Sequence, residues 1–387
     1  FYANDADFQQ TNVVGGQIGQ GTGGVTESLK ERVTMPLTGS YAETNHVLGH
    51  ELVHSFQYDF ALRERESGFQ LDRLPLWLIE GMAEYLSVGR DAPHTAMWLR
   101  DYAMRDDLPT IDQLTTDPQT YFPYRFGQAY MAYVGGKYGD PAVTNLFKLA
   151  GRVGPDSSFS YALGVTPDSL SEEWKRSVRD QYLPQMEGRT APSDVGRVVL
   201  GEPGAKNQFN ISPSVSPDGR YIAYIGRESI FTTNLLIADT RTGEVVETLE
   251  GTQANPHFDA LRFINSAGTW SPDGDKFAFV TFVEGENDLE VIDVGSGEVT
   301  RRISPKGIGA ITNPTWSPDG ESLYFISDQD GFKDVYRYAL EGGEGADGGG
   351  ARTYRITHLK TGVSGITAES PAMSVAAQSG RMAFSVF

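Results

Sequence analysis

Three histidines and a glutamate lie close together in the stretch HVLGHELVHSFQYDF, which covers residues 46–60. His50, Glu51 and His54 form the pattern H-E-x-x-H. On a helix, residues i and i+4 lie on one face, so both imidazoles can bind a single Zn²⁺ ion. Glu51 lies next to that face, where its carboxylate can act as general base on metal-bound water. The alternative is an amphipathic helix that is merely rich in histidine.

His46 lies one helical turn before His50, but helix geometry argues against a role as a third ligand. At ~1.5 Å per residue, its Cα lies ~12 Å from that of His54, whereas a Zn–N bond is only ~2.1 Å long. We therefore expect His46 to be a hydrogen-bonded histidine near the helix start, or a residue that supports a ligand. The remaining histidines have no partner pattern and are expected to be ordinary surface residues: His94, His257 and His358.

Two downstream segments resemble the gluzincin metallopeptidases, which include the M1 aminopeptidase group. WLIEG at residues 77–81 matches the W-L-x-E-G that follows H-E-x-x-H in that family, and PYRFG at residues 123–127 matches P-Y-x-x-G. The resemblance implies that Glu80 is the third zinc ligand and that Tyr124 stabilises the oxyanion. Such a phenol suits amide hydrolysis, because negative charge develops on the carbonyl oxygen. The alternative for Tyr124 is packing among the tyrosines that surround it in the sequence.

Glu84 lies one helical turn after Glu80. It can orient a ligand histidine, which is a common requirement of metal sites, or it can be a plain solvated glutamate. The G-x-M-E-N motif that binds the substrate's amine in M1 aminopeptidases is missing, so aminopeptidase specificity does not carry over. Residues from about 10 to 186 are most similar to peptidase MA-like domains, which often precede TolB-type propellers.

A helix-rich α+β region must position these residues. Apolar spacing predicts helices within residues 46–62, 75–89, 126–139, 143–151 and 166–183. Pro75 suits a first helical turn, Gly89 suits a C-terminal cap, and Thr166 suits an N-cap. Before residue 45 the chain is rich in glycine, and VTESLKERVTMPL at residues 25–37 has strand character.

A repeated turn-and-strand pattern marks the second half of the chain. SPDG begins at residues 216, 271 and 317, each time before an alternating strand, and a weaker copy starts at Ser374. In such a turn, proline fixes φ, aspartate bonds its own backbone and glycine supplies a positive φ. The spacings are near the ~40–50 residues of one four-stranded propeller blade. This half resembles the TolB-type β-propeller with PD40-type repeats.

These patterns predict a multidomain chain. A helix-rich α+β, zincin-like (peptidase MA-like) domain covers residues 1–186, a polar linker covers residues 187–197, and all-β propeller blades cover residues 198–387. A propeller closes with ~4–8 blades, whereas about three and the start of another are recognisable. We therefore expect a fragment of a longer protein, with a truncated N-terminus and a propeller that is incomplete at its C-terminal end.

Composition restricts the class of protein further. The 387 residues are 39% hydrophobic, and the net charge of −19 argues against nucleic acid or an anionic membrane as the main partner. The lack of cysteine excludes disulfides, thiolate catalysis and cysteine-ligated zinc. No stretch reaches the ~18–20 apolar residues of a membrane span, and no signal peptide is recognisable. The resemblance to TolB-like propellers and secreted metallopeptidases implies the bacterial periplasm or exterior.

Three functional hypotheses follow. The first is a metallopeptidase with one Zn²⁺ ion that cleaves a peptide or protein substrate, while the propeller binds or filters that substrate. The second is a non-catalytic cell-envelope binding or scaffold protein, which contacts a protein partner through its propeller. The third is a metallohydrolase with the same zinc chemistry and a substrate other than a peptide.

Overall fold

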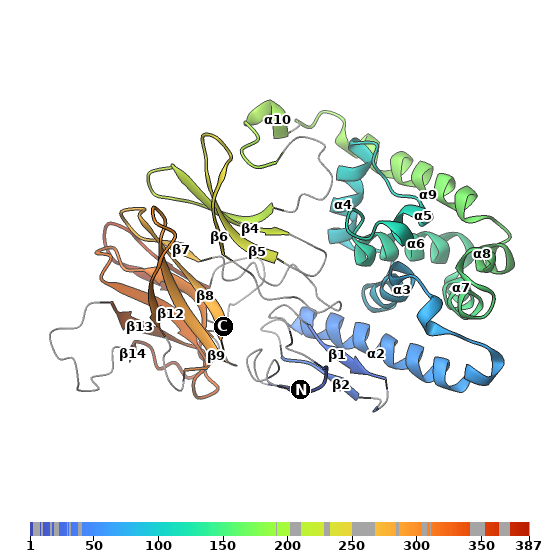
Figure 1. The fold of residues 1–387 in the computed structure, drawn as a ribbon, viewed down its shortest axis with the longest axis horizontal. Helices are drawn as coiled ribbons and strands as arrows, with labels where there is room; N and C mark the ends of the chain where they lie inside the picture. The colour runs from blue at the N-terminus through green and yellow to red at the C-terminus, as the bar shows by residue number, and fades with distance from the viewer. Residues whose placement is uncertain are drawn as a thin grey trace.

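The computed structural model describes residues 1–2, 8, 11–15, 18, 23–28, 30, 32–37, 41–190, 192–201, 210–227, 233–249, 268–283, 286–303, 308–309, 311–340, 353–363 and 372–386. A helix-rich region is followed by a region of β-sheets, and the two regions lie side by side (Figure 1). This order confirms the predicted succession of a helical and an all-β region. The described sheets are separate and are not closed into a ring.

A small two-stranded sheet and a series of helices form the first region. They are β1 (Val25–Glu27), β2 (Arg32–Thr34), α2 (Tyr41–Arg63), α3 (Leu76–Val88), α4 (Pro93–Met104), α5 (Ile111–Thr116), α6 (Pro123–Tyr138), α7 (Asp140–Val153), α8 (Pro155–Leu163) and α9 (Pro167–Tyr182). Three 3₁₀ turns accompany them, at Arg65–Ser67, Leu71–Arg73 and Leu183–Met186. None of the described helices combines the length and apolar character that crossing a membrane requires.

The predicted helices and strands of this region are present, with three additions. Helices α4, α5 and α8 were not predicted, and α6 begins at Pro123, before the predicted start at residue 126. Thr166 caps α9, since its side chain accepts a hydrogen bond from the Ser169 N–H at 3.2 Å. The stretch predicted as a linker contains one short helix, α10 (Pro192–Val195).

A buried aromatic cluster joins α3, α6 and α9. The ring of Tyr130 stacks on Trp174 with 4.1 Å between centroids, and it lies 5.9 Å from the ring of Trp77. The Tyr130 hydroxyl donates to the Pro109 carbonyl oxygen at 3.0 Å, so its one polar group is satisfied. These side chains are almost fully buried. These ring contacts pack α3, α6 and α9 against one another.

Three four-stranded antiparallel sheets and a further strand pair form the second region. The first sheet contains β3 (Asn210–Val215), β4 (Tyr221–Arg227), β5 (Thr233–Asp239) and β6 (Val245–Leu249). The second contains β7 (Thr269–Trp270), β8 (Lys276–Val283), β9 (Glu286–Asp293) and β10 (Val299–Ile303). The third contains β11 (Ile311–Trp316), β12 (Ser322–Ser327), β13 (Asp334–Ala339) and β14 (Thr353–Arg355), and the strand pair is β15 (Met373–Val375) and β16 (Met382–Phe384).

Each SPDG turn is followed by a strand, as predicted, and it connects the first two strands of its four-stranded sheet. In the first turn, Asp218 Oδ1 accepts from the Arg220 N–H at 3.0 Å, and Gly219 has a φ of 76°. Tryptophans just before the second and third turns link neighbouring sheets. The indole of Trp270 donates to the Ser214 carbonyl at 2.9 Å, and that of Trp316 donates to the Thr269 carbonyl at 3.0 Å.

Candidate metal centre

One face of α2 carries the residues of the H-E-x-x-H pattern into the interior. The buried residues of this helix recur at intervals of three and four, as expected for a helix face packed on a neighbour. They are Val47, His50, Glu51, His54 and Gln57. Helix α3 packs against α2 and contributes Glu80 and Glu84 from its own buried face.

The structure brings His50, His54 and Glu80 together around one point. The two Nε2 atoms are 3.0 Å apart, and each lies 3.1 Å from Glu80 Oε2. All three residues are at most 6% exposed. Zinc bonds of ~2.1 Å place tetrahedral ligand atoms about 3.4 Å apart, and the observed separations of 3.0 and 3.1 Å are close to this value. Two imidazoles and a carboxylate are also a usual protein ligand set for catalytic zinc, which keeps a fourth position for water.

Gln57 fixes the orientation of the His54 ring. Its side-chain nitrogen donates to the Ile79 carbonyl at 3.1 Å, so its oxygen is the atom that lies 2.8 Å from His54 Nδ1. His54 Nδ1–H therefore donates to Gln57, and the lone pair of Nε2 points to the shared site. The sequence analysis did not single out Gln57. Its position three residues after His54, on the same helix face, was the available signal.

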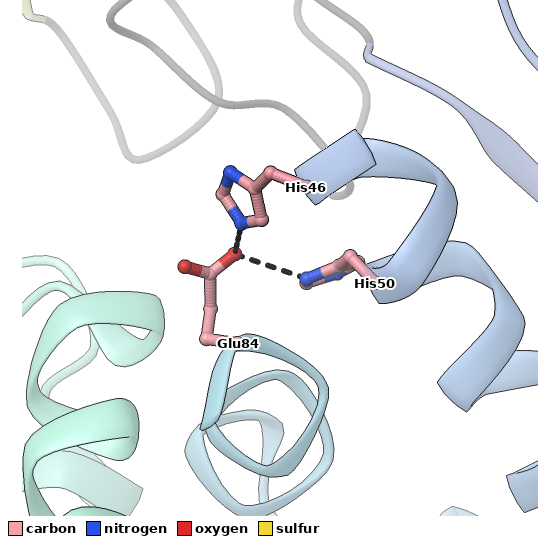
Figure 2. Close-up of side chains that lie close together, drawn as sticks. All are labelled: His46, His50 and Glu84. Carbon is pink, nitrogen blue, oxygen red and sulfur yellow. Dashed lines mark hydrogen bonds and ion pairs between the residues drawn. The ribbon is translucent and has the colours of Figure 1, made fainter. Parts of the chain in front are cut away.

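Glu84 contacts the other ligand histidine. Figure 2 shows His46 and His50 projecting from α2 toward the carboxylate of Glu84. Glu84 Oε1 lies 3.0 Å from His50 Nδ1 and 3.2 Å from His46 Nε2. The angle at His50 Nδ1 departs from hydrogen-bond geometry, so we treat this contact as a close electrostatic one. Glu84 is only 5% exposed, so the alternative of a solvated glutamate is wrong. His46 contacts Glu84 and is not part of the cluster formed by His50, His54 and Glu80.

Two groups among the described residues bring three possible ligand atoms within 4.8 Å of one another: His50 with His54 and Glu80, and His46 with His50 and Glu84. The second group is a poor metal site, because the guanidinium of Arg125 already donates to Glu84 Oε2 at 3.1 Å. A cation placed there would be repelled by this fixed positive charge. Occupation of both groups at once would require His50 to bind metals through both ring nitrogens. The first group is therefore the candidate metal centre.

The buried charges shift one another's pKa values. Burial disfavours the charged imidazole of His50, but Glu80 and Glu84 outweigh it and hold the pKa well above 6.5. For His54, burial again acts downward, and Glu80 raises the pKa above 6.5. Burial acts to raise the pKa of Glu84, yet the neighbouring histidines and Arg125 keep it well below 4.5. In the absence of metal, protons on the imidazoles thus balance the buried carboxylates.

Glu51 lies beside the ligand cluster and is held by the small sheet. The hydroxyl of Thr26 on β1 lies 2.6 Å from Glu51 Oε2 and 2.9 Å from the Glu51 carbonyl oxygen. Gly24 passes so close that a β-carbon there would lie 2.8 Å from Glu51 Cγ. Glu51 is 2% exposed. Neither Thr26 nor Gly24 was predicted, since no motif in the sequence connects this strand to the helix.

Tyr124 lies in the first turn of α6, next to the ligand cluster. Its ring stacks on that of His50, with 6.0 Å between centroids and 15° between planes. It also stacks on Phe122 at 5.1 Å. The structure thus brings together all the predicted site residues: His50, Glu51, His54, Glu80, Glu84 and Tyr124. Whether Tyr124 donates to an oxyanion stays a prediction.

Two family models match parts of the chain. Residues 204–351 match the TolB beta propeller domain (PD40), which confirms the predicted resemblance of this region. Residues 25–107 match the family described as peptidase of plants and bacteria. The second match spans β1, α2 and α3, and therefore includes the ligand cluster and Glu51. No curated protein sequence matches the chain.

Solved structures with similar regions include TolB proteins. The chain is 23% identical to TolB from Acinetobacter baumannii, with a TM-score of 0.34, over 46% of this chain and 38% of that one. For a putative TolB from Agrobacterium tumefaciens, the identity is 21% and the TM-score 0.30, over 42% of this chain and 51% of that one. The match thus spans about half or less of either TolB chain. Similarity at this level identifies no activity.

Proposed function

We propose that this chain is a zinc-dependent metallopeptidase that hydrolyses peptide bonds in a peptide or protein substrate. The observation that carries the proposal is the convergence of His50 Nε2, His54 Nε2 and Glu80 Oε2 within 3.1 Å of one another. The carboxylate of Glu51 is not part of this cluster but interacts electrostatically with His54. The match of residues 25–107 to a peptidase family supports the peptidase part of the proposal.

Each residue has a distinct part in the proposed reaction. His50, His54 and Glu80 would hold the zinc ion, and the ion would supply Lewis acidity at the site. Glu51 accepts a proton from the attacking water and passes it to the leaving amine. Tyr124 donates a hydrogen bond to the carbonyl oxygen as this atom gains negative charge.

The supporting residues keep these groups in place. The Thr26 hydroxyl bonds to Glu51, and Gln57 accepts from His54 Nδ1, so neither the base nor this ligand can rotate freely. Such positioning matters because a displacement of ~1 Å can reduce a rate about 100-fold. The low exposure of the cluster also excludes bulk water, which strengthens the electrostatic interactions inside it.

Metal content and turnover together test the proposal. Wild-type protein purified without added metal should contain about one zinc ion per chain by plasma emission analysis, and His50→Ala should contain far less. Glu51→Gln should keep its zinc but lose cleavage of casein or of a peptide library, because the general base is removed. Less than about half an equivalent of zinc in wild type, unchanged in His50→Ala, would refute the proposal.

The alternative is a cell-envelope protein that binds a partner through its propeller, and the family match of residues 204–351 is the observation in its favour. Zinc-loaded wild type and Glu51→Gln that are equally inactive on all peptides would favour this alternative. Equal turnover by the two proteins would likewise remove Glu51 from the reaction. For either function, we propose the bacterial periplasm or exterior as the location.

A further inference from the structure

We propose that His46 and Arg125 are positioning residues for the metal centre, and that they act through Glu84 on the ligand His50. The inference rests on the proposed function, because it assumes that His50 binds the metal. The sequence analysis gave Arg125 no role and left that of His46 open. Figure 2 shows the part of this arrangement that involves His46, Glu84 and His50.

The Glu84 carboxylate is held by two other helices. His46 comes from the first part of α2 and lies 3.2 Å from Oε1. Arg125 comes from the first turn of α6 and donates through Nη1 to Oε2 at 3.1 Å. Because one partner engages each oxygen, the carboxylate cannot rotate about its Cγ–Cδ bond without losing a contact. Its Oε1 therefore stays 3.0 Å from His50 Nδ1.

The contacts of Glu84 with Arg125 and His46 lie in a largely buried environment, where loss of a charge partner is costly. The side chains of Glu84 and Arg125 are both 6% exposed, and that of His46 is 22% exposed. A buried charge without a partner is costly, so removal of one member of a buried pair is strongly destabilising. Arginine keeps its charge in proteins and presents its donors in a rigid plane, so lysine is only a partial substitute. Arg125 thus supplies both the charge and the direction that Glu84 requires.

The effect on the metal passes through the ring of His50. A carboxylate close to Nδ1 favours the tautomer that carries its proton on that atom, which leaves the Nε2 lone pair for the metal. For His50 this effect is electrostatic, because the 3.0 Å contact with Glu84 departs from hydrogen-bond geometry. Glu84 can do this only while Oε1 faces the ring. His46 and Arg125 are therefore expected to change metal affinity although neither contacts the metal. Arg125 also makes a second metal ion at Glu84 unfavourable, so the site is expected to bind one ion.

Zinc affinity of the full chain, measured by competition with a chromophoric chelator, tests the inference. Arg125→Met and His46→Leu should each weaken zinc binding by about 10–100-fold. Arg125→Lys and His46→Gln, which retain a donor, should recover part of the loss. Two variants of solvent-exposed residues serve as matched controls, Arg105→Met and His358→Gln, and should bind zinc as wild type does.

A second readout separates positioning from folding. The absorption spectrum of the Co²⁺-loaded protein reports the ligand field at the metal. We expect it to change in Arg125→Met and in His46→Leu, whereas a purely structural role would lower only the melting temperature of the metal-free protein. If Arg125→Met does not fold, His46→Leu is the deciding variant, because the side chain of His46 is more exposed than that of Arg125.

Zinc binding by the wild type distinguishes failure of this inference from failure of the proposed function. Wild type that binds no zinc would defeat the proposed function. Wild type that binds zinc, with variants that keep its affinity within about twofold and its Co²⁺ spectrum, would overturn the role of His46 and Arg125 alone.

Discussion

Gly81 on α3 and Gly127 on α6 face each other at backbone contact. A β-carbon on Gly81 would lie 2.4 Å from the Gly127 Cα, and one on Gly127 would lie 2.3 Å from the Trp77 carbonyl oxygen. These are the glycines that end the WLIEG and PYRFG segments. The contact explains why both motifs need glycine. It lets α6 approach α3 closely enough for Arg125 to reach Glu84.

Replacement of Gly127 by alanine should destabilise the helical region. The added methyl group has no room against the α3 backbone, and overpacking of this kind typically costs ~1–3 kcal/mol. Urea unfolding followed by far-UV circular dichroism at 222 nm, where helices dominate the signal, measures the change. Gly136→Ala on the same helix is the control, since nothing lies within 4 Å of its β-carbon position. It should gain up to about 1 kcal/mol from helix propensity. Equal stability of the two variants would contradict the proposed contact.

The ligand cluster could be predicted from sequence because its spacing is local. His50 and His54 are four residues apart on one helix, and the match of WLIEG to a known motif supplied Glu80. Thr26 and Arg125 could not be found in this way, because their partners lie on other elements and their roles depend on which faces pack together. Gln57 lies on the same helix as His54, but its orientation depends on the Ile79 carbonyl of α3.

The same reasoning holds for the fold. Helices with strong apolar periodicity and clear caps were predicted, such as the one that Thr166 begins. Helices α5 and α8 have only 6 and 9 residues. Such short segments give too few repeats of the helical period to stand out, and their helical state depends on tertiary packing. In the second region, each SPDG turn encodes its own conformation locally, which is why the turns were predictable.

Gln57→Leu should weaken zinc binding. Without the Gln57 oxygen, His54 Nδ1–H loses its acceptor in a buried site, and loss of such a partner typically costs about 10–100-fold in metal affinity. Chelator competition measures the affinity, with Ser55→Ala as a control on the same helix. Gln57→Glu retains an acceptor and should bind more tightly than Gln57→Leu. Wild-type affinity in Gln57→Leu would show that His54 needs no such support.

Tyr124→Phe should reduce turnover and leave zinc content unchanged. Loss of one oxyanion donor typically costs about 10²–10³-fold in kcat, whereas the phenylalanine ring preserves the stacking on His50 and Phe122. The measurement is peptide cleavage at saturating substrate, beside Tyr138→Phe at the end of the same helix. Unchanged kcat would support the packing alternative for this tyrosine.

Zinc uptake should release protons at neutral pH. The pKa values of His50 and His54 are raised above 6.5 in the metal-free protein, so zinc must displace protons that this pair of imidazoles holds at neutral pH. Calorimetry in two buffers with different ionisation enthalpies counts the released protons. Zinc affinity should fall as pH is lowered through the raised pKa values toward 6.5. Release of no protons at pH 7 would contradict the raised values.

The stability of the metal-free protein should fall as pH rises, whereas zinc affinity should rise with pH. A raised pKa in the folded state contributes stability that is fully present below 6.5 and is lost as pH rises through the folded value. Thermal unfolding of chelator-treated protein between about pH 6 and 9 measures this contribution. The His50→Ala variant, which lacks the most strongly shifted imidazole, should have a flatter profile. The zinc-loaded protein should not lose stability over the same range.

The tryptophans that join the sheets give the second region a direction. The indole N–H of Trp270 in the second sheet donates to a carbonyl oxygen of the first sheet. In the same way, the indole N–H of Trp316 in the third sheet donates to a carbonyl oxygen of the second sheet. Val215 holds the corresponding place in the first sheet and is 56% exposed, whereas Trp270 and Trp316 are each 7% exposed. The two ends of this row are therefore chemically unlike, as in a head-to-tail polymer. A sheet inserted in reverse would set donor against donor and acceptor against acceptor, so the repeats can be assembled in one orientation only.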